Sequence, residues 1–254
     1  MYLLQAHSDD ALSLTNFTAD KIPRYAILSH TWEADNQEVT FEDVKNNEGV
    51  NKIGYRKIRF CAAQAKKDEL QYFWVDSCCI NKSSAADLAE AINSMFRWYR
   101  NAAKCYAYLA DVQTADSDQQ AFRQSRWFKR GWTLQELLAP PEVEFFSQQG
   151  YKIGDKSSLE LEIHEITGIP VQALYAHEVS LSQFTIDERF SWMEKRKTTI
   201  EEDQAYCLFG LFDVYLPLIY GEGKENALRR LRQEIFIRNA VSNSDIRKCI
   251  DHLK

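Results

Sequence analysis

The sequence predicts an α/β fold, with a parallel sheet flanked by helices in about the first 150 residues and a mainly helical second half. Three observations predict it. The 254 residues are 45% hydrophobic and 13% aromatic, which is enough for a sizeable core. Short apolar runs alternate with amphipathic segments in the first half, and such alternation places helices on both faces of a parallel sheet. In the second half of the chain, apolar residues recur mainly at helical spacing.

The elements of the first half alternate in chain order. Four short apolar runs are suited to buried strands: residues 25–29 (YAILS), 72–76 (YFWVD), 105–109 (CYAYL) and 143–146 (VEFF). Three segments between them repeat apolar side chains at helical spacing: residues 55–70, 85–100 and 127–139. We therefore expect each strand to be followed by a helix that crosses back over the sheet.

The third of these helices carries an isolated acidic residue. Pro140 and Pro141 end the helix expected at residues 127–139, because proline does not continue a helix. Trp132 and Glu136 lie four residues apart and therefore share a face. A large aromatic ring beside one carboxylate fits either a solvated surface or the floor of a site.

The second half is less regular. Helical spacing recurs in three segments: residues 159–167, the region around 191–196, and residues 224–240. Thr198 or Thr199 is expected to cap a further helix ending near Gly210, because acidic residues stand three positions on. Arg189 and Arg196 are expected to form ion pairs that hold this half on the first.

Composition excludes several classes of protein. A net charge of −6 without a sustained basic stripe argues against a nucleic-acid partner. No apolar run reaches the roughly 18 residues of a membrane span, and no signal peptide begins the chain, so we expect a cytoplasmic protein. Six cysteines without CxxC spacing and five scattered histidines predict neither a disulfide scaffold nor a metal site. No cofactor is expected.

Candidate site residues follow the predicted strands. In parallel sheets, ligands bind outside the carboxyl ends of the strands. Seven residues are expected to line one crevice there: Ser29, His30 and Trp32 after the first strand, Asp76 and Cys79 after the second, and Trp132 and Glu136 on the third helix. Each also fits a structural role: His30 in a turn, Asp76 as a cap, Cys78 and Cys79 as core thiols, and Glu136 as a solvated helix residue.

Four blocks of the sequence are similar to a known family. They are YAILSHTW (25–32), FWVDSCCINK (73–82), RWFKRGWTLQELLAP (126–140) and RFSWMEKRKTTIEEDQAYCLFGLFDVYLPLIYGEGKENALRRLRQEI (189–235). Together they resemble the fungal heterokaryon-incompatibility (HET) domain over residues 1–240. The resemblance implies a role in programmed cell death, a fungal immune response, when genetically different cells fuse. It also implies a NACHT module further along the chain, with residues 241–254 as a connector toward it.

Residues 1–150 are more distantly similar to TIR domains. The run RGWTLQEL resembles the TIR motif SxWCLxEL, and the alignment places the TIR catalytic glutamate on Glu136 and the tryptophan on Trp132. This resemblance implies a self-associating hydrolase that cleaves the nicotinamide–ribose bond of NAD. Two features depart from the TIR pattern. Residues 113–124 lengthen the approach to the third helix, and residues 151–240 have no TIR counterpart.

A single glutamate is chemically sufficient for this reaction. Nicotinamide leaves NAD as a neutral base, so no general acid is needed, and one carboxylate stabilises the oxocarbenium-like ribose. Trp32 and Trp132 are the candidates for stacking on substrate rings, and Ser29 or Thr133 for holding the charge of Glu136.

Three hypotheses follow. The first is an NAD-hydrolysing effector, the second is a self-assembling adaptor without enzymatic activity, and the third is a hydrolase built on Cys78 or Cys79.

Overall fold

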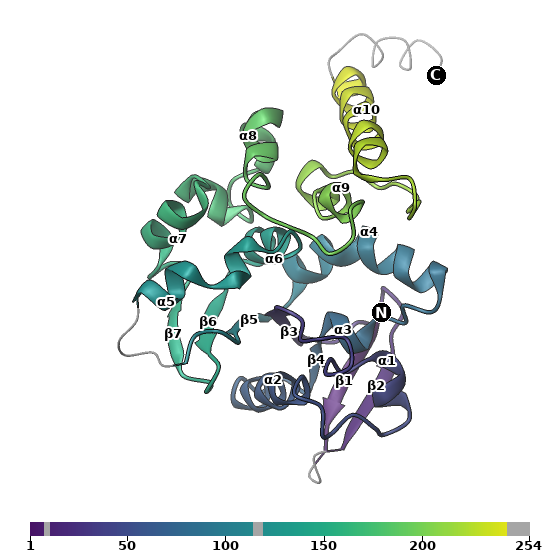
Figure 1. The fold of residues 1–254 in the computed structure, drawn as a ribbon, viewed down its shortest axis with the longest axis vertical. Helices are drawn as coiled ribbons and strands as arrows, with labels where there is room; N and C mark the ends of the chain where they lie inside the picture. Colours follow the sequence, from purple (N-terminus) through teal and green to yellow (C-terminus); the bar gives the residue numbers. More distant parts are fainter. Residues whose placement is uncertain (8–10, 114–118, 243–254) are drawn as a thin grey trace.

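The computed structural model describes residues 1–7, 11–113 and 119–242, which form a seven-stranded sheet and the helices around it (Figure 1). The strand order is β2-β1-β4-β3-β5-β6-β7. Four parallel strands make its centre: β4 (Tyr72–Trp74), β3 (Tyr25–His30), β5 (Lys104–Leu109) and β6 (Glu144–Ser147). These are the four strands that the sequence predicts, and the α/β fold class is confirmed.

The edges of the sheet are antiparallel. Three further strands pair there: β1 (Tyr2–Ala6), β2 (Leu12–Asn16) and β7 (Lys152–Asp155). The sequence does not predict them, because most of their side chains are only half-buried. Such strands lack the continuous apolar run that identified the central ones. The sheet is therefore mixed, with the predicted parallel strands at its centre.

Helices cover both faces of the sheet (Figure 1). The first half contains α1 (Phe41–Lys45), α2 (Tyr55–Lys67), α3 (Asp76–Cys79), α4 (Ala85–Asn101) and α5 (Gln119–Gln124). α2 and α4 confirm the helices expected at residues 55–70 and 85–100. α2 packs on β3, β4 and β5. α4 lies on the other face, where Tyr25 Oη donates to the Trp98 carbonyl at 2.6 Å and Tyr99 Oη donates to the Leu28 carbonyl at 2.9 Å.

The third predicted helix is two shorter ones. A 3-10 helix, η1 (Arg126–Lys129), precedes α6 (Thr133–Leu138), and between them the backbone pairs with the second half. Gly131 N donates to the Lys197 carbonyl at 2.9 Å, and Lys197 N donates to the Lys129 carbonyl at 2.7 Å. A Cβ on Gly131 would lie 2.5 Å from Thr198 Cγ2, so only glycine permits this approach. The single helix expected at residues 127–139 is interrupted for this reason.

The second half consists of short helices and one long one. They are α7 (Glu160–Thr167), η2 (Val171–Tyr175), η3 (Leu181–Gln183), α8 (Ile186–Ser191), α9 (Asp203–Tyr206), η4 (Phe209–Phe212) and α10 (Lys224–Ser242). α7 and α10 confirm the helices expected at 159–167 and 224–240. The helix expected around 191–196 is wrong, because α8 ends at Ser191. The cap at Thr198 or Thr199 is also wrong: α9 begins at Asp203, and Thr198 Oγ1 donates to the Ile200 carbonyl instead.

The two buried arginines do not act as predicted. Neither Arg189 nor Arg196 forms an ion pair with a carboxylate in the described residues, so that expectation is wrong. Arg189 Nη1 donates to the Leu211 carbonyl at 2.9 Å, within the second half. Arg196 Nη1 donates to the Arg130 carbonyl at 2.9 Å and to Thr133 Oγ1 at 2.8 Å. Arg196 therefore joins the halves through hydrogen bonds to neutral groups.

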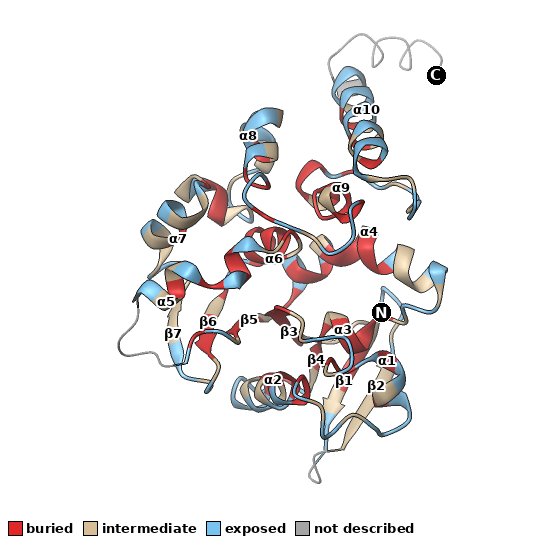
Figure 2. Ribbon diagram, in the orientation of Figure 1, coloured by how far each residue is buried: buried red, intermediate tan, exposed pale blue. Residues whose placement is uncertain are grey.

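The core lies between the sheet and the helices that cover it. Figure 2 shows the central strands and α6 largely in the colour of buried residues, and every residue of α6 is buried. None of the described helices combines the length and apolar character needed to cross a membrane. Beyond Ser242, the connector predicted at residues 241–254 lies outside the described residues, as do residues 114–118 of the predicted insert.

Candidate functional site

Glu136 is buried beneath the carboxyl end of β3, with 2% of its surface exposed. Ser29 Oγ donates to Glu136 Oε2 at 2.5 Å, and Trp127 Nε1 donates to the same Ser29 hydroxyl at 2.8 Å. Because Ser29 accepts from the indole, its own hydrogen is directed to the glutamate. The expectation that Ser29 supports Glu136 is confirmed. Thr133 does not, because its hydroxyl lies 2.6 Å from the Trp127 carbonyl.

The environment of Glu136 changes its ionisation. Burial raises its pKa from 4.5 to about 8, and the negative charge of Asp76 adds to the shift. The hydrogen bond from Ser29 and the positive charge of Arg130 act in the opposite direction. At neutral pH the carboxyl group is therefore mostly protonated, and a bound cation would favour its ionised form.

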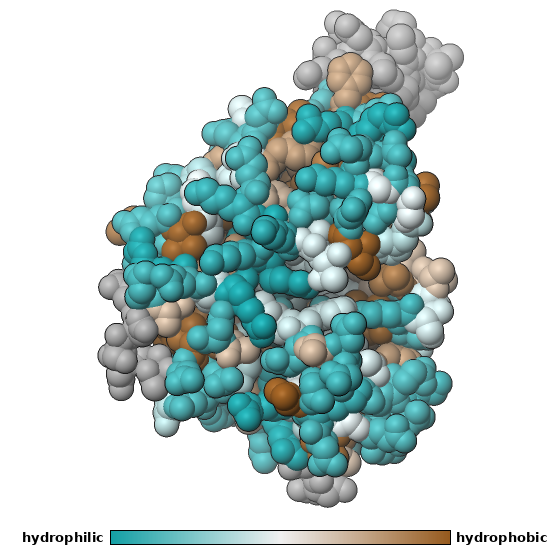
Figure 3. Space-filling model, in the orientation of Figure 1, coloured by the Kyte–Doolittle hydropathy of each residue, from teal (hydrophilic) through white to brown (hydrophobic). Residues whose placement is uncertain are grey.

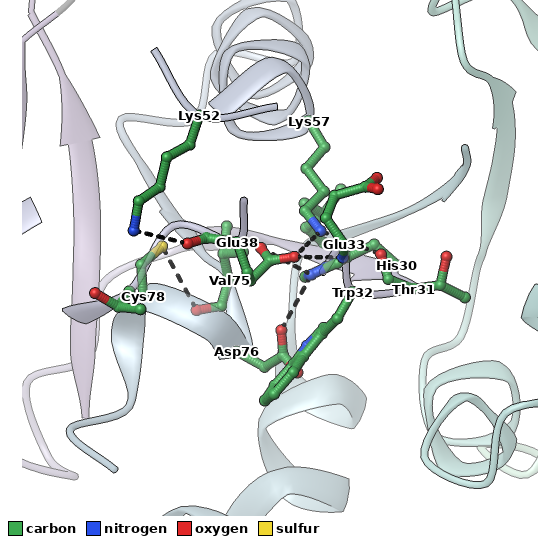
Figure 4. A network of polar contacts seen from close by, with 12 residues as sticks. His30, Thr31, Trp32, Glu33, Glu38, Lys52, Lys57, Val75, Asp76 and Cys78 are labelled. Carbon is green, nitrogen blue, oxygen red and sulfur yellow. Dashed lines mark hydrogen bonds and ion pairs between the residues drawn. The ribbon is translucent and has the colours of Figure 1, made fainter. Parts of the chain in front are cut away.

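His30, Trp32 and Asp76 lie together on the other side of β3. Successive residues of a strand point to opposite faces, so His30 points away from the face that carries Ser29. His30 Nε2 lies 3.3 Å from Asp76 Oδ1, and Trp32 Nε1 donates to Asp76 Oδ2 at 2.8 Å (Figure 4). Burial lowers the pKa of His30 well below its usual value, so the ring is neutral. Burial raises the pKa of Asp76.

Two buried charged residues extend this cluster. Lys57 Nζ lies 2.6 Å from Glu38 Oε2 and donates to the Thr31 carbonyl at 3.1 Å (Figure 4). Glu38 Oε1 is 4.0 Å from His30 Nε2. Sequence reasoning missed both residues. The sequence could have indicated that Lys57 is buried, because it stands four residues before Cys61 on the apolar face of α2. It could not have indicated Glu38, which lies in a loop without periodicity.

The remaining candidates have hydrogen-bond partners other than Glu136. Trp132 Nε1 donates to Asp203 Oδ2 at 3.0 Å, and Tyr220 Oη donates to Asp203 Oδ1 at 3.1 Å. Trp132 is therefore held by the second half. Cys79 is buried at the end of α3, and its sulfur accepts from Val75 N at 3.3 Å.

The thiols do not have the environment of nucleophiles. Burial raises the pKa of Cys78 well above 9, which leaves it protonated. The five described cysteines, including Cys79, are all free and buried. This environment argues against the cysteine-hydrolase hypothesis. Among the described residues, no group of three or more acidic, histidine or cysteine side chains could hold a metal ion.

The fold and the site define an α/β protein with two features at the carboxyl ends of parallel strands. One is the buried carboxyl group of Glu136, and the other is the cluster of His30, Asp76, Glu38 and Lys57. Residues 25–121 match the model of the family described as heterokaryon incompatibility protein (HET). The vegetative incompatibility protein HET-E-1 of Podospora anserina is 60% identical over 222 residues, which cover 85% of this chain. The chain belongs to the HET family. It spans 16% of the length of HET-E-1. No solved structure matches the chain.

Proposed function

We propose that this chain is a cell-death effector domain in heterokaryon incompatibility and that it hydrolyses the nicotinamide–ribose bond of NAD at Glu136. The similarity to HET-E-1 supports the role in incompatibility. A cytoplasmic location, where NAD is available, belongs to the same proposal. So do self-association and a NACHT module beyond residues 241–254.

The observation that carries the chemical step is the buried Glu136 with its raised pKa. A carboxyl group whose ionisation is suppressed by burial is unfavourable for folding at neutral pH, and such groups cluster at functional sites. Its hydroxyl donor Ser29 is held in place by Trp127, and the Tyr99 hydroxyl also acts on the carboxyl group. Glu136 therefore has a fixed position at the edge of the sheet where α/β proteins bind ligands.

The proposed reaction needs one carboxylate. The bond between the ribose C1′ and the nicotinamide nitrogen breaks, its electron pair neutralises the pyridinium, and nicotinamide leaves. The ionised Glu136 stabilises the positive charge that develops on the ribose, and water then adds to C1′ and releases a proton. The positive charge of the nicotinamide ring in bound NAD lowers the pKa of Glu136 toward the ionised form. Because Glu136 is 2% exposed, the side chains that cover it must move before NAD can reach it.

Nicotinamide release tests this proposal. Concentrated wild-type protein is incubated with NAD beside Glu136→Gln and the control Glu142→Gln, which removes a carboxylate whose side chain is 72% exposed. We expect release by the wild type and the control, and a decrease of at least about 100-fold in Glu136→Gln. Equal release by all three proteins would refute the role of Glu136.

A second candidate is the adaptor without enzymatic activity. Its supporting observation is that Phe236 and Ile237 of α10 are 74% and 54% exposed, an apolar surface suited to contacts between chains. Under this candidate, Glu136→Gln leaves cell killing intact, whereas Phe236→Ser with Ile237→Ser abolishes it. The opposite pattern in a cell-killing assay would favour the enzyme.

A further inference from the structure

Basic side chains gather where β3 ends, although the whole chain carries a net charge of −6. Two of them contact consecutive residues that follow this strand. Lys82 Nζ lies 3.4 Å from the centroid of the Trp32 ring, and Arg126 Nη2 lies 3.8 Å from Glu33 Oε1. Figure 3 shows that the middle of this face of the molecule is mostly hydrophilic.

Arg130 brings a third cation to this region. It lies in the segment between η1 and α6, six residues before Glu136. Its Nη1 donates to Thr199 Oγ1 at 3.1 Å. The positive charges of Arg130, Arg126 and Lys82 all act on the buried His30 and contribute, after burial and Lys57, to lowering its pKa. Lys82 and Arg126 contact residues that follow β3, and Arg130 precedes α6, the helix whose Glu136 accepts from Ser29 of β3.

The contacts of these residues leave part of their positive charge unpaired. Asp76 is the main electrostatic partner of Lys82, and burial raises the pKa of that carboxyl group. An aromatic ring holds Lys82 and a hydroxyl holds Arg130, while Glu33 is at a weak ion-pair distance from Arg126. The other carboxyl groups nearby have their own partners: Trp32 for Asp76, Lys57 for Glu38, Ser29 for Glu136, and Trp132 with Tyr220 for Asp203. Positive charge thus remains available to an anion.

A buried arginine behind this region is an independent sign of an anionic ligand. Arg196 is 4% exposed, and its guanidinium donates to the Arg130 carbonyl and to Thr133 Oγ1. Its Nη2 has no hydrogen-bond partner within the described part of the chain. A buried guanidinium with an unpaired donor is unfavourable, and a bound anion nearby would offset this cost.

We propose that Lys82, Arg126 and Arg130 bind the diphosphate group of a dinucleotide at the entrance to Glu136. Arginine forks match phosphate oxygens in bidentate geometry, and the lysine adds a point charge. This inference rests on the proposed NAD hydrolysis. The diphosphate joins the nicotinamide ribose to the adenosine, so anchoring it holds the ribose near the carboxylate.

Binding of inorganic pyrophosphate tests the inference without any turnover. Calorimetry is carried out with the wild type, Arg130→Gln, Lys82→Gln and the control Lys152→Gln, which removes an exposed positive charge on β7. We expect the wild type and the control to bind, and each variant at the entrance to bind roughly 10-fold or more weakly. Lys82 is exposed, so its variant is expected to fold even where Arg130→Gln does not. No binding by the wild type, or equal binding by all folded proteins, would overturn the inference.

Turnover of two substrates separates this inference from the proposed function. Nicotinamide riboside has the scissile bond of NAD but no diphosphate. We expect Lys82→Gln to raise KM for NAD roughly 10-fold with little change in kcat, and to leave nicotinamide riboside cleavage unchanged. Equal effects on both substrates would contradict diphosphate recognition. If neither substrate is cleaved by the wild type, NAD hydrolysis fails, and pyrophosphate binding alone decides the inference.

Discussion

The Ser29 hydroxyl connects the Trp127 indole to the Glu136 carboxyl group. The hydroxyl oxygen accepts from Trp127 Nε1 at 2.8 Å, and the hydroxyl donates to Glu136 Oε2 at 2.5 Å. The bond from Trp127 therefore fixes the direction in which Ser29 donates. A donor to a carboxylate stabilises the ionised form and lowers its pKa. In this site, that hydrogen bond opposes the effects of burial and of Asp76. Ser29 is therefore a positioning residue that also sets how much of Glu136 is ionised.

Ser29→Ala is expected to shift the pH dependence of activity. Without its hydroxyl donor, Glu136 has a pKa higher still than about 8, so the rise of kcat with pH moves to higher pH. We expect kcat at pH 7 to fall roughly 10-fold, which corresponds to the loss of one hydrogen bond to a charged group. The measurement is a pH–rate profile of nicotinamide release. Ser94→Ala, which alters another buried serine, serves as the control. An unchanged profile in Ser29→Ala would exclude this role.

The stability of the protein is expected to depend on pH through Glu136. Its pKa is about 8 in the folded protein and 4.5 when exposed, so the folded state binds an extra proton between these values. The contribution of protonated Glu136 to the free energy of unfolding is fully present below pH 4.5, and it is lost as the pH rises through 8. Over that interval it amounts to on the order of 5 kcal/mol.

Glu136→Gln is expected to remove this pH dependence. The amide keeps the shape of the side chain but cannot ionise, so the variant gains stability relative to the wild type as the pH rises from 5 to 8. Urea unfolding at several pH values measures the difference in free energy of unfolding. Glu142→Gln, which removes an exposed carboxylate, serves as the control. A constant difference for Glu136→Gln would mean that its pKa is not raised.

At the scale of elements, the position of α6 depends on the short backbone pairing before it. The segment ending at Gly131 pairs with Lys197 of the second half, and α6 begins two residues later. At its other end, the buried Lys156 donates to the Pro140 carbonyl at 2.6 Å. Lys156 also donates to the Leu137 carbonyl at 3.4 Å, which the helix leaves free. Both ends of α6 are therefore fixed from outside the helix.

Gly131→Ala is expected to destabilise the protein and displace α6. The added Cβ would lie 2.5 Å from Thr198 Cγ2 and 2.6 Å from Met193 Cε, so the two segments must separate. We expect a loss of about 1–3 kcal/mol in thermal or urea unfolding, together with reduced activity. Adding Thr198→Ser removes the nearer methyl group and should restore part of the stability. A variant as stable as the wild type would contradict the close approach.

The helices and strands differ in how well the sequence predicts them. The central strands and α2, α4, α7 and α10 were predictable, because each buries one continuous apolar run or stripe. The break before α6 was not, since it depends on contacts between Gly131 and residues more than 60 positions away. The site was predictable in part. Strand order places Ser29, His30 and Asp76 at one edge, but the contribution of Glu38 comes from a loop whose path no local pattern specifies.

At the scale of the whole molecule, the second half completes the surroundings of the site. Asp203 holds Trp132 and Tyr220, and Arg196 bonds to the segment before α6. Gly210 packs so closely on α4 that a Cβ there would lie 2.1 Å from Phe96 Cβ. These contacts cover surfaces of α4 and α6 that would otherwise face water. Residues 151–240 are therefore expected to be necessary for the folded state of the first half.

A chain ending at residue 150 is therefore expected not to fold cooperatively. Ending there removes the partners that the second half provides, among them Lys197 for Gly131, Asp203 for Trp132, and Lys156 for the end of α6. It also exposes the apolar residues of α4 and α6 that these segments cover, which a sheet of this size cannot offset. Thermal unfolding followed by circular dichroism is the measurement, with a chain ending at residue 242 as the control. We expect a cooperative transition in the control and none in the shorter chain. A cooperative transition in the shorter chain, within a few degrees of the control, would show that the first half is an independent domain.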